Sequence, residues 1–471
     1  MAKGKKPACD GRILILGGGP TGLGAAWRLT ELGYTNFRLY EATRVWGGLS
    51  ASFVDPKGFT WDIGGHIQFS HYAYFDKLMK TILQNNSLSH VRESWVWIEK
   101  RFVPYPFQLN IHHLRPSSLR KCLAGLEAVA ALKKKTTSLN FEQWILRSFG
   151  KGIAELFMLP YNRKVWAHPL KDIATEWLGE RVPTVDLKAI RASTQSRDHD
   201  QHLRSWGPNR IFRFPKHGGT GAIWKCLAEM IPPKNRSLGK RATAIDSDTR
   251  IVTFSDGSQD HYDALLSTIP LPDLIQLANL SSLKTVSKKL ISNHIHVVGL
   301  GLRKPITDGL ATKHWIYFPQ RSVPFYRLTV FSNYSPYTVP DPDTFWSLMA
   351  EIAGSSAPPL DASEITQKTV HTLLQTGFIQ SRDQIASTWY HFAPRAYPIP
   401  SLHRNRALTT ILPVLEKKKI FSRGRFGGWK YEVGNQDHTC MQGVEVVNRL
   451  LLGSREITYF HPCSVNRQAK G

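Results

Sequence analysis

The fold is decided by residues 12–24, which read RILILGGGPTGLG. The first five are a short, mainly apolar run, long enough for a buried parallel strand and too short for a helix. Residues 25–33 then have the composition of a helix closed by a glycine, and a second strand over residues 36–40 ends in Glu41. This is G-x-G-x-x-G between strand and helix with an acidic residue roughly 20 positions on, which predicts a dinucleotide-binding unit.

Each residue type in this motif has a physical role. Gly17 permits the tight turn, Gly19 lets the backbone approach a pyrophosphate, and Gly22 lets helix and strand pack closely. The helix N-terminus offers unpaired N–H groups and the positive end of its dipole to the phosphates. Glu41 is expected to accept hydrogen bonds from the adenosine ribose hydroxyls.

Two further glycine pairs, Gly47-Gly48 and Gly64-Gly65, follow soon after the acidic residue. They indicate a longer cofactor that runs over more backbone. In this respect the chain resembles the large amine-oxidase-like class of flavoproteins, whose corresponding segments run beside FAD. The resemblance implies FAD, with NAD as the weaker alternative for the tightly held cofactor.

Composition and length favour a globular protein of two to three domains, because 42% of the 471 residues are hydrophobic and 21% are charged. The five cysteines are odd in number and never form C-x-x-C, which argues against a disulfide framework and a zinc site. No apolar run of about 18 residues suggests a membrane span. The N-terminal residues lack the apolar region of a secretory signal, so a cytoplasmic location is expected.

The net charge of +25 raises the possibility of a nucleic-acid or membrane-surface protein. The basic clusters are short, however, and lie far apart at residues 133–135 and 417–419. No basic region leads into heptads, and no RNP-like or zinc-finger pattern is present. We interpret most of the excess as a solvated surface that also draws an anionic substrate towards a cleft, and expect no nucleic-acid partner.

The rest of the chain predicts an α/β fold: a discontinuous Rossmann-type FAD-binding domain with an inserted helical domain and an antiparallel β-sheet domain. Helical periodicity runs from Leu114 to Trp177, a strand over 263–270 returns to the Rossmann sheet, and a final helix spans Met441 to Leu452. The expected divisions are 1–110 (FAD-binding, first part), 111–204 (helical, with a mobile loop), 205–290 (FAD-binding, second part), 291–405 (antiparallel sheet) and 406–471 (FAD-binding, third part).

Two arginines stand among aromatic and glycine residues, Arg327 in PFYR and Arg425 in GRFG. Arginine in such a setting suits bidentate contact with phosphate, although a salt-bridged or snorkelling surface arginine is the alternative for either one. A polar run at residues 431–438 precedes the final helix, whose start either steadies negative charge on a reduced flavin or is simply capped. Hydrolase, zinc-protease and Walker motifs are absent, which favours a phosphorylated, hydroxyl-rich substrate over an apolar amine.

Together these residues resemble the eukaryotic UDP-galactopyranose mutases of the fungal and trypanosomatid type, along nearly the whole chain. The most specific segments are 64–72 (GGHIQFSHY), 103–108 (VPYPFQ), 206–209 (WGPN), 331–335 (FSNYS) and 431–438 (YEVGNQDH). The chain departs from the family pattern at Gln68, Leu159, Arg163 and His168, where the family has apolar residues or, in place of Leu159, an arginine.

The resemblance implies an enzyme that interconverts UDP-galactopyranose and UDP-galactofuranose for galactofuranose biosynthesis. In that family reduced FAD attacks the anomeric carbon through N5 and expels UDP, and the sugar ring opens and recloses. Because the flavin must first be reduced, NADPH is the implied reductant. An amine or protoporphyrinogen-type oxidase on the same fold is the enzymatic alternative, and a basic nucleic-acid-binding protein that keeps a flavin fold is the non-enzymatic one.

The resemblance also implies roles for individual residues. His66 would lie against the flavin, and Arg327 and Arg425 would grip the diphosphate; with Arg181 they form the implied catalytic set. The implied cofactor-binding residues are Gly17, Gly19, Pro20, Thr21, Gly22, Glu41, Gly47, Gly48, Leu49, Ser50, Gly64, Gly65, His66, Gly434, Asn435 and Gln436. The implied substrate-binding residues are Tyr105, Gln108, Phe157, Met158, Asn162, Trp166, Arg181, Asn209, Tyr317, Arg327, Tyr334, Tyr397, Arg425, Tyr431 and Asn435. His71, Arg92 and Ser94 are the implied NADPH contacts, with Tyr317 beside them.

Overall fold

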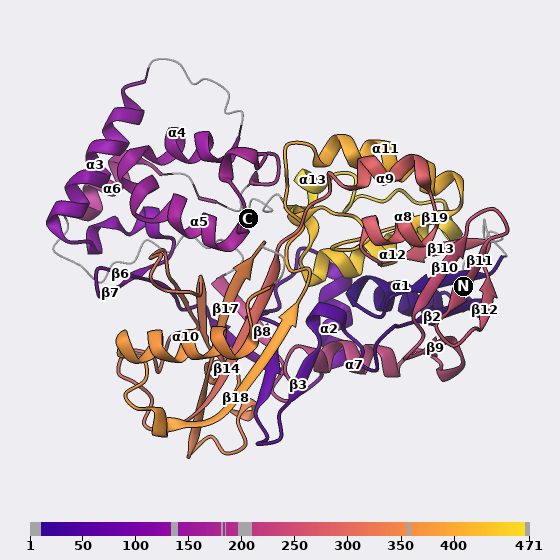
Figure 1. Ribbon diagram of the computed structural model, residues 1–471, viewed down its shortest axis with the longest axis horizontal. Helices are drawn as coiled ribbons and strands as arrows, with labels where there is room; N and C mark the ends of the chain where they lie inside the picture. Colours follow the sequence, from indigo (N-terminus) through magenta and orange to yellow (C-terminus); the bar gives the residue numbers. More distant parts are fainter. Residues whose placement is uncertain are drawn as a thin grey trace.

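The structure is a computed structural model, which describes residues 11–132, 140–179, 182–183, 185–195, 210–355 and 359–466. Figure 1 shows three groups of elements: a parallel sheet between two layers of helices, a large second sheet, and a cluster of helices beside the second sheet. In the described part of the chain, no helix is both long and apolar enough to cross a bilayer.

The cofactor-binding sheet has five strands in the order β19-β13-β1-β2-β9, and every neighbouring pair is parallel. Its central strand is fully buried, as expected for an apolar strand covered by helices on both faces. The predicted returning strand is present and pairs with the central strand, so that prediction is confirmed. The strands are β1 (Ile13–Leu16), β2 (Phe37–Tyr40), β9 (Arg236–Ser237), β13 (Ala264–Ser267) and β19 (Ile420–Ser422).

Helices cover both faces of this sheet. One core is built with α1 (Pro20–Glu31), α2 (Ala73–Leu83), α7 (Gly221–Glu229) and α12 (Gln436–Leu452). The opposite core is built with α8 (Leu271–Leu277), α9 (Ser281–Ser287), α11 (Arg404–Lys417) and the small sheet β10 (Ala242–Asp246), β11 (Ile251–Phe254) and β12 (Gln259–His261). The helix α12 begins five residues before the predicted Met441, and the first turn of α12, including Asp437 and His438, is buried despite its polar side chains. The helix packs on α1.

The second sheet has seven strands in the order β18-β14-β17-β16-β15-β6-β7, and α10 (Ala362–Gln375) packs on it. It differs from a purely antiparallel sheet in one pair, because β6 runs parallel to β15. Two of its strands, β6 and β7, come from residues placed by sequence in the first FAD-binding segment. The strands are β6 (Ser94–Ile98), β7 (Arg101–Pro104), β14 (His294–Arg303), β15 (Trp315–Tyr317), β16 (Arg327–Val330), β17 (Phe345–Gly354) and β18 (Ile385–Ala393).

The helical cluster occupies the region in which the sequence predicts helices. It consists of α3 (Pro116–Ala130), α4 (Phe141–Ile153), a π-helical turn (Ala154–Met158), α5 (Leu159–Trp166) and α6 (Leu187–Gln195). Its core continues into the side chains of the seven-stranded sheet, so helices and sheet share one apolar cluster. The remaining elements are β3 (Ser52–Val54), β4 (Thr60–Asp62), β5 (Leu88–Val91), β8 (Ile211–Phe214) and α13 (Pro462–Asn466).

Candidate active site

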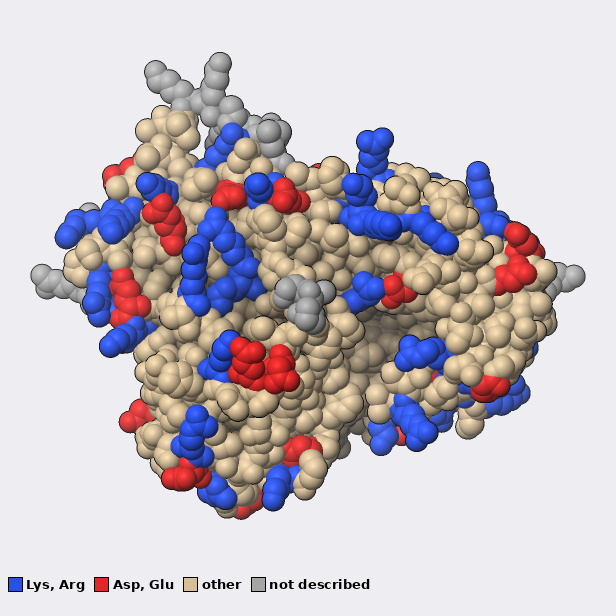
Figure 2. Space-filling view, viewed as in Figure 1, with Lys and Arg blue, Asp and Glu red and all other residues tan. Residues whose placement is uncertain are grey.

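A cavity of about 640 Å³ lies where the three groups of elements meet. The space-filling view in Figure 2 shows basic side chains spread over several parts of the surface with acidic ones among them. The cavity is lined by residues from the glycine turn, the two sheets and the helical cluster. Of the implied site residues, its lining includes Gly17, Gly19, Pro20, Thr21, Glu41, Gly48, Leu49, Ser50, Gly65, His66, Arg92, Tyr105, Asn162, Trp166, Tyr317, Arg327, Tyr397, Arg425, Tyr431, Gly434, Asn435 and Gln436.

The glycine turn has the geometry that the motif predicts. Gly17 has φ +107°, which side-chain-bearing residues rarely adopt, and a Cβ on Gly22 would lie 1.9 Å from the Gly17 carbonyl oxygen. A Cβ on Gly19, by contrast, would meet nothing closer than 3.8 Å. Gly17 and Gly22 therefore pack together and close the turn, whereas the backbone at Gly19 faces open space that a ligand can approach.

The carboxylate of Glu41 lies beside this turn. One oxygen accepts a hydrogen bond from the Gly18 backbone N–H at 2.6 Å, and the other accepts one from the Thr43 N–H at 2.7 Å. Each carboxylate oxygen has a second acceptor site, and Glu41 lines the cavity. The backbone thus fixes the carboxylate in place while it keeps capacity for ribose hydroxyls.

His66 lies in the lining between the glycine turn and the arginines. Burial lowers its pKa to about 4; Arg327 and Arg425 lower it as well, and Glu351 acts in the opposite direction. The imidazole is therefore neutral at physiological pH. Its buried Nδ1 has no hydrogen-bond partner in the protein, which leaves that nitrogen for a bound group.

These features fit a flavin dinucleotide. The N-terminus of α1 has no side-chain cap, and neither has that of α12, where Asn435 is the N-cap residue. Both helix starts border the same cavity, so both dipoles favour negative charge inside it. The glycine turn suits a pyrophosphate, Glu41 a ribose, and the start of α12 the electron-rich end of a reduced isoalloxazine.

Arg327 reaches the cavity from β16 and is held by a carboxylate that the sequence did not single out. Its Nε and Nη2 donate to the two Glu351 oxygens at 2.5 and 2.7 Å. Glu351 also accepts hydrogen bonds from the Tyr326 hydroxyl at 2.8 Å and the Gly65 N–H at 3.0 Å. One buried carboxylate therefore orients both the arginine and the backbone next to His66.

The charges of this pair depend on each other. Burial opposes ionisation of both groups, yet Arg327 holds the pKa of Glu351 below its ordinary range, and Glu351 holds that of Arg327 above it. A signal for Glu351 exists in the sequence, since it is the only charged residue of the apolar strand β17. Its partner depends on the strand register, which places Arg327 opposite Glu351.

Arg425 is held differently. Its Nε donates to the Ala396 carbonyl at 3.0 Å and its Nη1 to the Gly434 carbonyl at 2.9 Å. The guanidinium carbon lies 5.0 Å from the centre of the Tyr397 ring, and Tyr431 packs edge-on against the same ring. Two arginines and two tyrosines thus border one cavity, an arrangement suited to a diphosphate.

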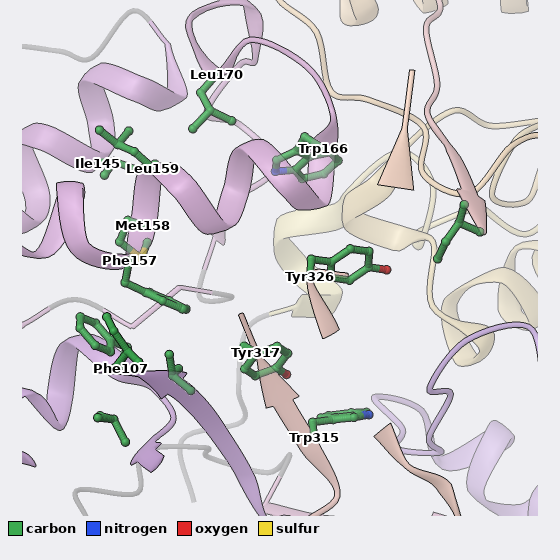
Figure 3. Close-up of a cluster of buried hydrophobic side chains, with 14 of the residues drawn as sticks. Phe107, Ile145, Phe157, Met158, Leu159, Trp166, Leu170, Trp315, Tyr317 and Tyr326 are labelled. Atoms are coloured by element: carbon green, nitrogen blue, oxygen red, sulfur yellow. The ribbon is translucent and has the colours of Figure 1, made fainter. Parts of the chain in front are cut away.

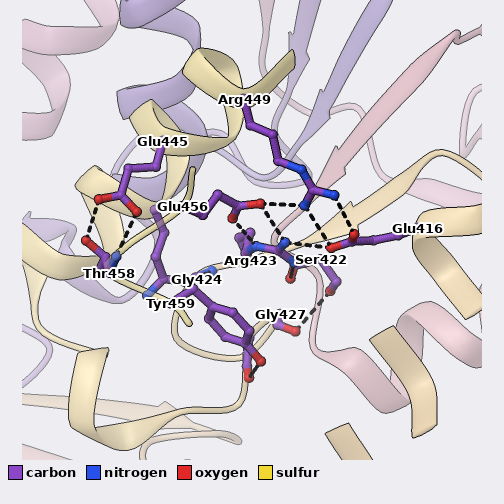
Figure 4. A network of polar contacts seen from close by, with 12 residues as sticks. Glu416, Ser422, Arg423, Gly424, Gly427, Glu445, Arg449, Glu456, Thr458 and Tyr459 are labelled. Carbon is purple, nitrogen blue, oxygen red and sulfur yellow. Dashed lines mark hydrogen bonds and ion pairs between the residues drawn. The ribbon is translucent and has the colours of Figure 1, made fainter. Parts of the chain in front are cut away.

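An ion-pair network surrounds Arg423, two residues before Arg425 in the sequence (Figure 4). Arg423 donates to both oxygens of Glu456 at 2.5 and 2.9 Å and to Glu416 at 2.7 Å. Arg449 bonds to the same two carboxylates. This network ties the C-terminal segment to the loop after β19, and therefore fixes the base of the loop that carries Arg425.

On the helical side, Lys164 connects the cavity wall to the seven-stranded sheet. Its ammonium donates to the carbonyls of Phe318, Gln320 and Phe325 at 2.8, 3.1 and 2.5 Å. Burial lowers the pKa of Lys164 to about 7. Because these carbonyls lie between β15 and β16, Lys164 joins α5 to the segment that leads into Arg327. Sequence reasoning did not identify this residue.

Several implied site residues lie outside the cavity lining. Phe157 stacks on Phe107 at 4.8 Å within the apolar core, on the helical side of the view in Figure 3, and Met158 lies in the same core. The Gln108 amide donates to the Pro183 carbonyl, and Tyr334 is fully buried. Gly22, Gly47, Gly64 and Ser94 also lie outside the lining, and Arg181 and Asn209 lie outside the described residues.

Of the three implied NADPH contacts, Arg92 lines the cavity, whereas His71 and Ser94 lie outside its lining. The Arg92 guanidinium lines the cavity and lies 4.4 Å from the centre of the Trp315 ring. His71 lies outside the lining, with its Nδ1 2.7 Å from an Asp437 oxygen in the first turn of α12. The imidazole of His71 is therefore engaged with the helix start that borders the cavity.

Comparison with known proteins defines the class of protein. The profile of the family described as flavin containing amine oxidoreductase matches residues 20–389, and the chain belongs to this family. Two solved structures share the fold at low sequence identity. A putative protoporphyrinogen oxidase from Exiguobacterium sp. 255-15 is 15% identical, with 94% of this chain and 99% of that chain covered and a TM-score of 0.71. A CLA-producing fatty acid isomerase from P. acnes is 14% identical, with coverages of 93% and 98% and a TM-score of 0.62.

A much stronger match is the crystal structure of reduced UDP-galactopyranose mutase. It is 43% identical, with 97% of this chain and 99% of that chain covered and a TM-score of 0.92. Within the flavin-containing class, the chain is therefore a member of the UDP-galactopyranose mutase family. The sequence expectations of an FAD-binding Rossmann-type fold and of a mutase rather than an oxidase are confirmed.

Proposed function

We propose that the protein interconverts UDP-galactopyranose and UDP-galactofuranose with its FAD in the reduced state. The observation that carries this proposal is the convergence of Arg327, Arg425, Tyr397 and Tyr431 on the cavity that the glycine turn borders. When bound and reduced, the flavin supplies the nucleophile for the anomeric carbon. The protein binds and orients the sugar nucleotide and stabilises the charge of the departing diphosphate.

The residues divide this work. The two arginines are charge-assisted donors to the diphosphate, so they both position the substrate and favour its release from the sugar carbon. Neutral His66 keeps its unpartnered Nδ1 for the bound flavin or sugar without adding a second positive charge. On the other wall, Asn162 and Trp166 of α5 border the cavity where the uridine would bind.

The direct test is conversion of the sugar nucleotide. The FAD-loaded protein is incubated anaerobically with UDP-galactopyranose, with and without dithionite, and the products are separated by chromatography. We expect UDP-galactofuranose only in the reduced sample. In a separate incubation of the oxidised protein in air, addition of the substrate should produce no hydrogen peroxide. Equal conversion by oxidised protein would contradict the proposed role of the flavin, and substrate-dependent peroxide would favour the oxidase alternative.

A binding experiment tests the phosphate role of the arginines. Arg425→Ala is expected to weaken UDP binding about 10- to 100-fold, because a charge-assisted hydrogen bond contributes about 1.5–3 kcal/mol. FAD content should stay unchanged. Arg395→Ala is the matched control, since Arg395 lies next to Ala396 but pairs with Asp273. UDP affinity that survives in Arg425→Ala would remove this residue from the site.

We also propose NADPH as the physiological reductant. Support comes from Arg92, a cation that lines the cavity and is held against Trp315. Anaerobic mixing with NADPH should bleach the oxidised flavin absorbance, and Arg92→Ala should slow this reaction while dithionite still reduces the protein fully. Equal rates in both proteins would exclude Arg92 from NADPH binding.

The assignment to the eukaryotic type and to the cytoplasm belongs to the same proposal. The type rests on segments such as GGHIQFSHY at residues 64–72. Fractionation of cells that express the tagged protein tests the location. Recovery with membranes or in the culture medium would contradict it.

A further inference from the structure

Gln68 is a polar residue held rigidly at the edge of the cavity. Its backbone forms a two-way bridge with Arg213: the Gln68 N–H donates to the Arg213 carbonyl at 3.0 Å, and the Arg213 N–H donates back at 2.9 Å. The side chain lines the cavity, yet Gln68 is only 5% exposed. Its amide is therefore confined to one small region of the wall.

The orientation of this amide follows from a chain of hydrogen bonds. The indole N–H of Trp224 is only a donor, and it lies 2.7 Å from the side-chain oxygen of Gln436. The same oxygen lies 2.8 Å from the Gln68 Nε2. Because the Gln436 atom must be the acceptor, the Gln68 group facing it must be the NH₂. The Gln68 oxygen consequently points the other way.

This oxygen is buried and has no hydrogen-bond partner in the protein. A buried acceptor without a partner costs about 1–3 kcal/mol, and native structures contain few of them. An apolar side chain of the same size would avoid that cost. The combination of a fixed amide and an open acceptor in a cavity wall indicates that a ligand supplies the missing donor.

The surroundings of Gln68 indicate that the ligand which supplies this donor is the cofactor and not the sugar nucleotide. Trp224 belongs to the core that packs on the five-stranded sheet, and Gln436 begins α12. His66, two residues earlier in the same segment, lines the cavity as well. Arg327, which we assign to the diphosphate, comes from the seven-stranded sheet instead. Gln68 thus belongs to the cofactor-binding side of the cavity.

We propose that the side-chain oxygen of Gln68 accepts a hydrogen bond from an N–H or O–H group of the bound flavin dinucleotide. Trp224 and Gln436 are the positioning residues that keep this oxygen turned towards the flavin. The inference depends on flavin binding and not on the sugar reaction, so the two can fail independently.

The test compares wild type with Gln68→Met, which keeps the length of the side chain and removes the acceptor. FAD is titrated into the deflavinated full-length protein and followed by flavin fluorescence. We expect about a tenfold increase in the FAD dissociation constant. The melting temperature of the FAD-free protein should change little, because the variant removes an unsatisfied acceptor together with one donor to the Gln436 oxygen, which keeps its hydrogen bond from Trp224. UDP affinity at saturating FAD should stay within twofold.

An unchanged FAD dissociation constant would overturn the proposal, whether or not the variant loses UDP affinity or melts at a lower temperature. If Gln68→Met does not fold, Trp224→Phe decides the question. It removes the donor that fixes the Gln436 amide, so both amides can turn over and the Gln68 oxygen loses its orientation. We expect about a threefold weaker FAD complex in that variant, and unchanged affinity would contradict the proposal.

Discussion

The cofactor end and the substrate end of the cavity are suited to their ligands by different groups of the protein, the backbone at the first and charged side chains at the second. At the cofactor end, backbone N–H groups border the cavity, and the absence of a side chain at Gly19 keeps it open. At the opposite end the side chains of Arg327 and Arg425 border the cavity. Arg327 is held by Glu351, and Lys164 attaches α5 to the segment that leads into Arg327 through three carbonyls. At the cofactor end, stability and ligand binding should therefore be reduced most by substitutions that add side-chain atoms. At the substrate end, they should be reduced most by substitutions that remove a charge.

The largest effect is expected at the substrate end, in Glu351→Gln. Removal of one charge from the buried pair leaves the Arg327 guanidinium without its carboxylate, which costs about 3–5 kcal/mol of unfolding free energy. Urea denaturation of the FAD-loaded protein measures this loss. Glu364→Gln, which removes one member of an exposed pair on α10, is the matched control and should cost less than about 1 kcal/mol.

The double variant Arg327→Met with Glu351→Leu separates stability from binding. Because apolar residues can replace a buried ion pair at little cost, we expect it to recover part of the stability that Glu351→Gln loses; the Tyr326 hydroxyl and the Gly65 N–H still lose their acceptor. UDP binding should nevertheless remain weak, since the phosphate donor is gone. A double variant as unstable as the single one would show that the pair contributes to folding by more than charge compensation.

The second largest effect is expected at the cofactor end, in Gly22→Ala. The added Cβ would lie 1.9 Å from the Gly17 carbonyl oxygen, so helix and strand must separate. We expect a loss of about 3 kcal/mol in the unfolding free energy of the FAD-free protein, together with loss of FAD binding.

Two other glycines serve as controls for Gly22→Ala. Gly33→Ala places a Cβ in open space at φ +70°, which costs about 1 kcal/mol through backbone strain alone. Gly19→Ala should leave stability nearly unchanged but weaken FAD binding, because its Cβ meets no protein atom closer than 3.8 Å. If all three variants lost the same stability, close packing at Gly22 would not be the cause.

The difference between the cofactor end and the substrate end also explains which features could be predicted from the sequence. The glycine turn is local, since strand, turn and helix are contiguous and each glycine acts within the motif. A dinucleotide-binding fold could therefore be inferred from residues 12–41, and the glycine pairs at 47–48 and 64–65 added FAD. Arg327 could be recognised from its neighbours, but its contact with Glu351 could not, because that contact arises from the pairing of β16 with β17. The early start of α12 was missed for a related reason: tertiary burial of Asp437 and His438 overrides their polar character.

His66 lines the cavity as well, and its pKa depends on its burial and on the charges of Glu351, Arg327 and Arg425. Burial lowers the pKa of folded His66 to about 4, against about 6.5 in an unfolded chain. Below pH 6.5 the unfolded chain binds a proton that the folded protein does not, so stability falls as the pH drops from 6.5 to about 4. The expected loss for this solvent-bordering group is about 2 kcal/mol.

The measurement is urea denaturation of the FAD-free protein at several pH values, in wild type and in His66→Asn. Asparagine does not titrate, so the difference in unfolding free energy between the two proteins should change across this interval. Parallel curves would show that His66 has an ordinary pKa, and that the arginines and the burial around it do not keep the imidazole neutral.

The smallest effect is expected from Arg163, which is adjacent to Lys164 on α5. Arg163 forms a 2.9 Å ion pair with Glu142, but its side chain is 44% exposed, so water and salt screen the interaction. Arg163→Ala should cost less than about 1 kcal/mol and change UDP affinity less than about twofold. Lys164→Met, one residue away, removes a buried cation from three carbonyls and should weaken both stability and UDP binding. Equal effects of the two substitutions would mean that net positive charge, and not the buried attachment of α5 to the sheet, governs the substrate end.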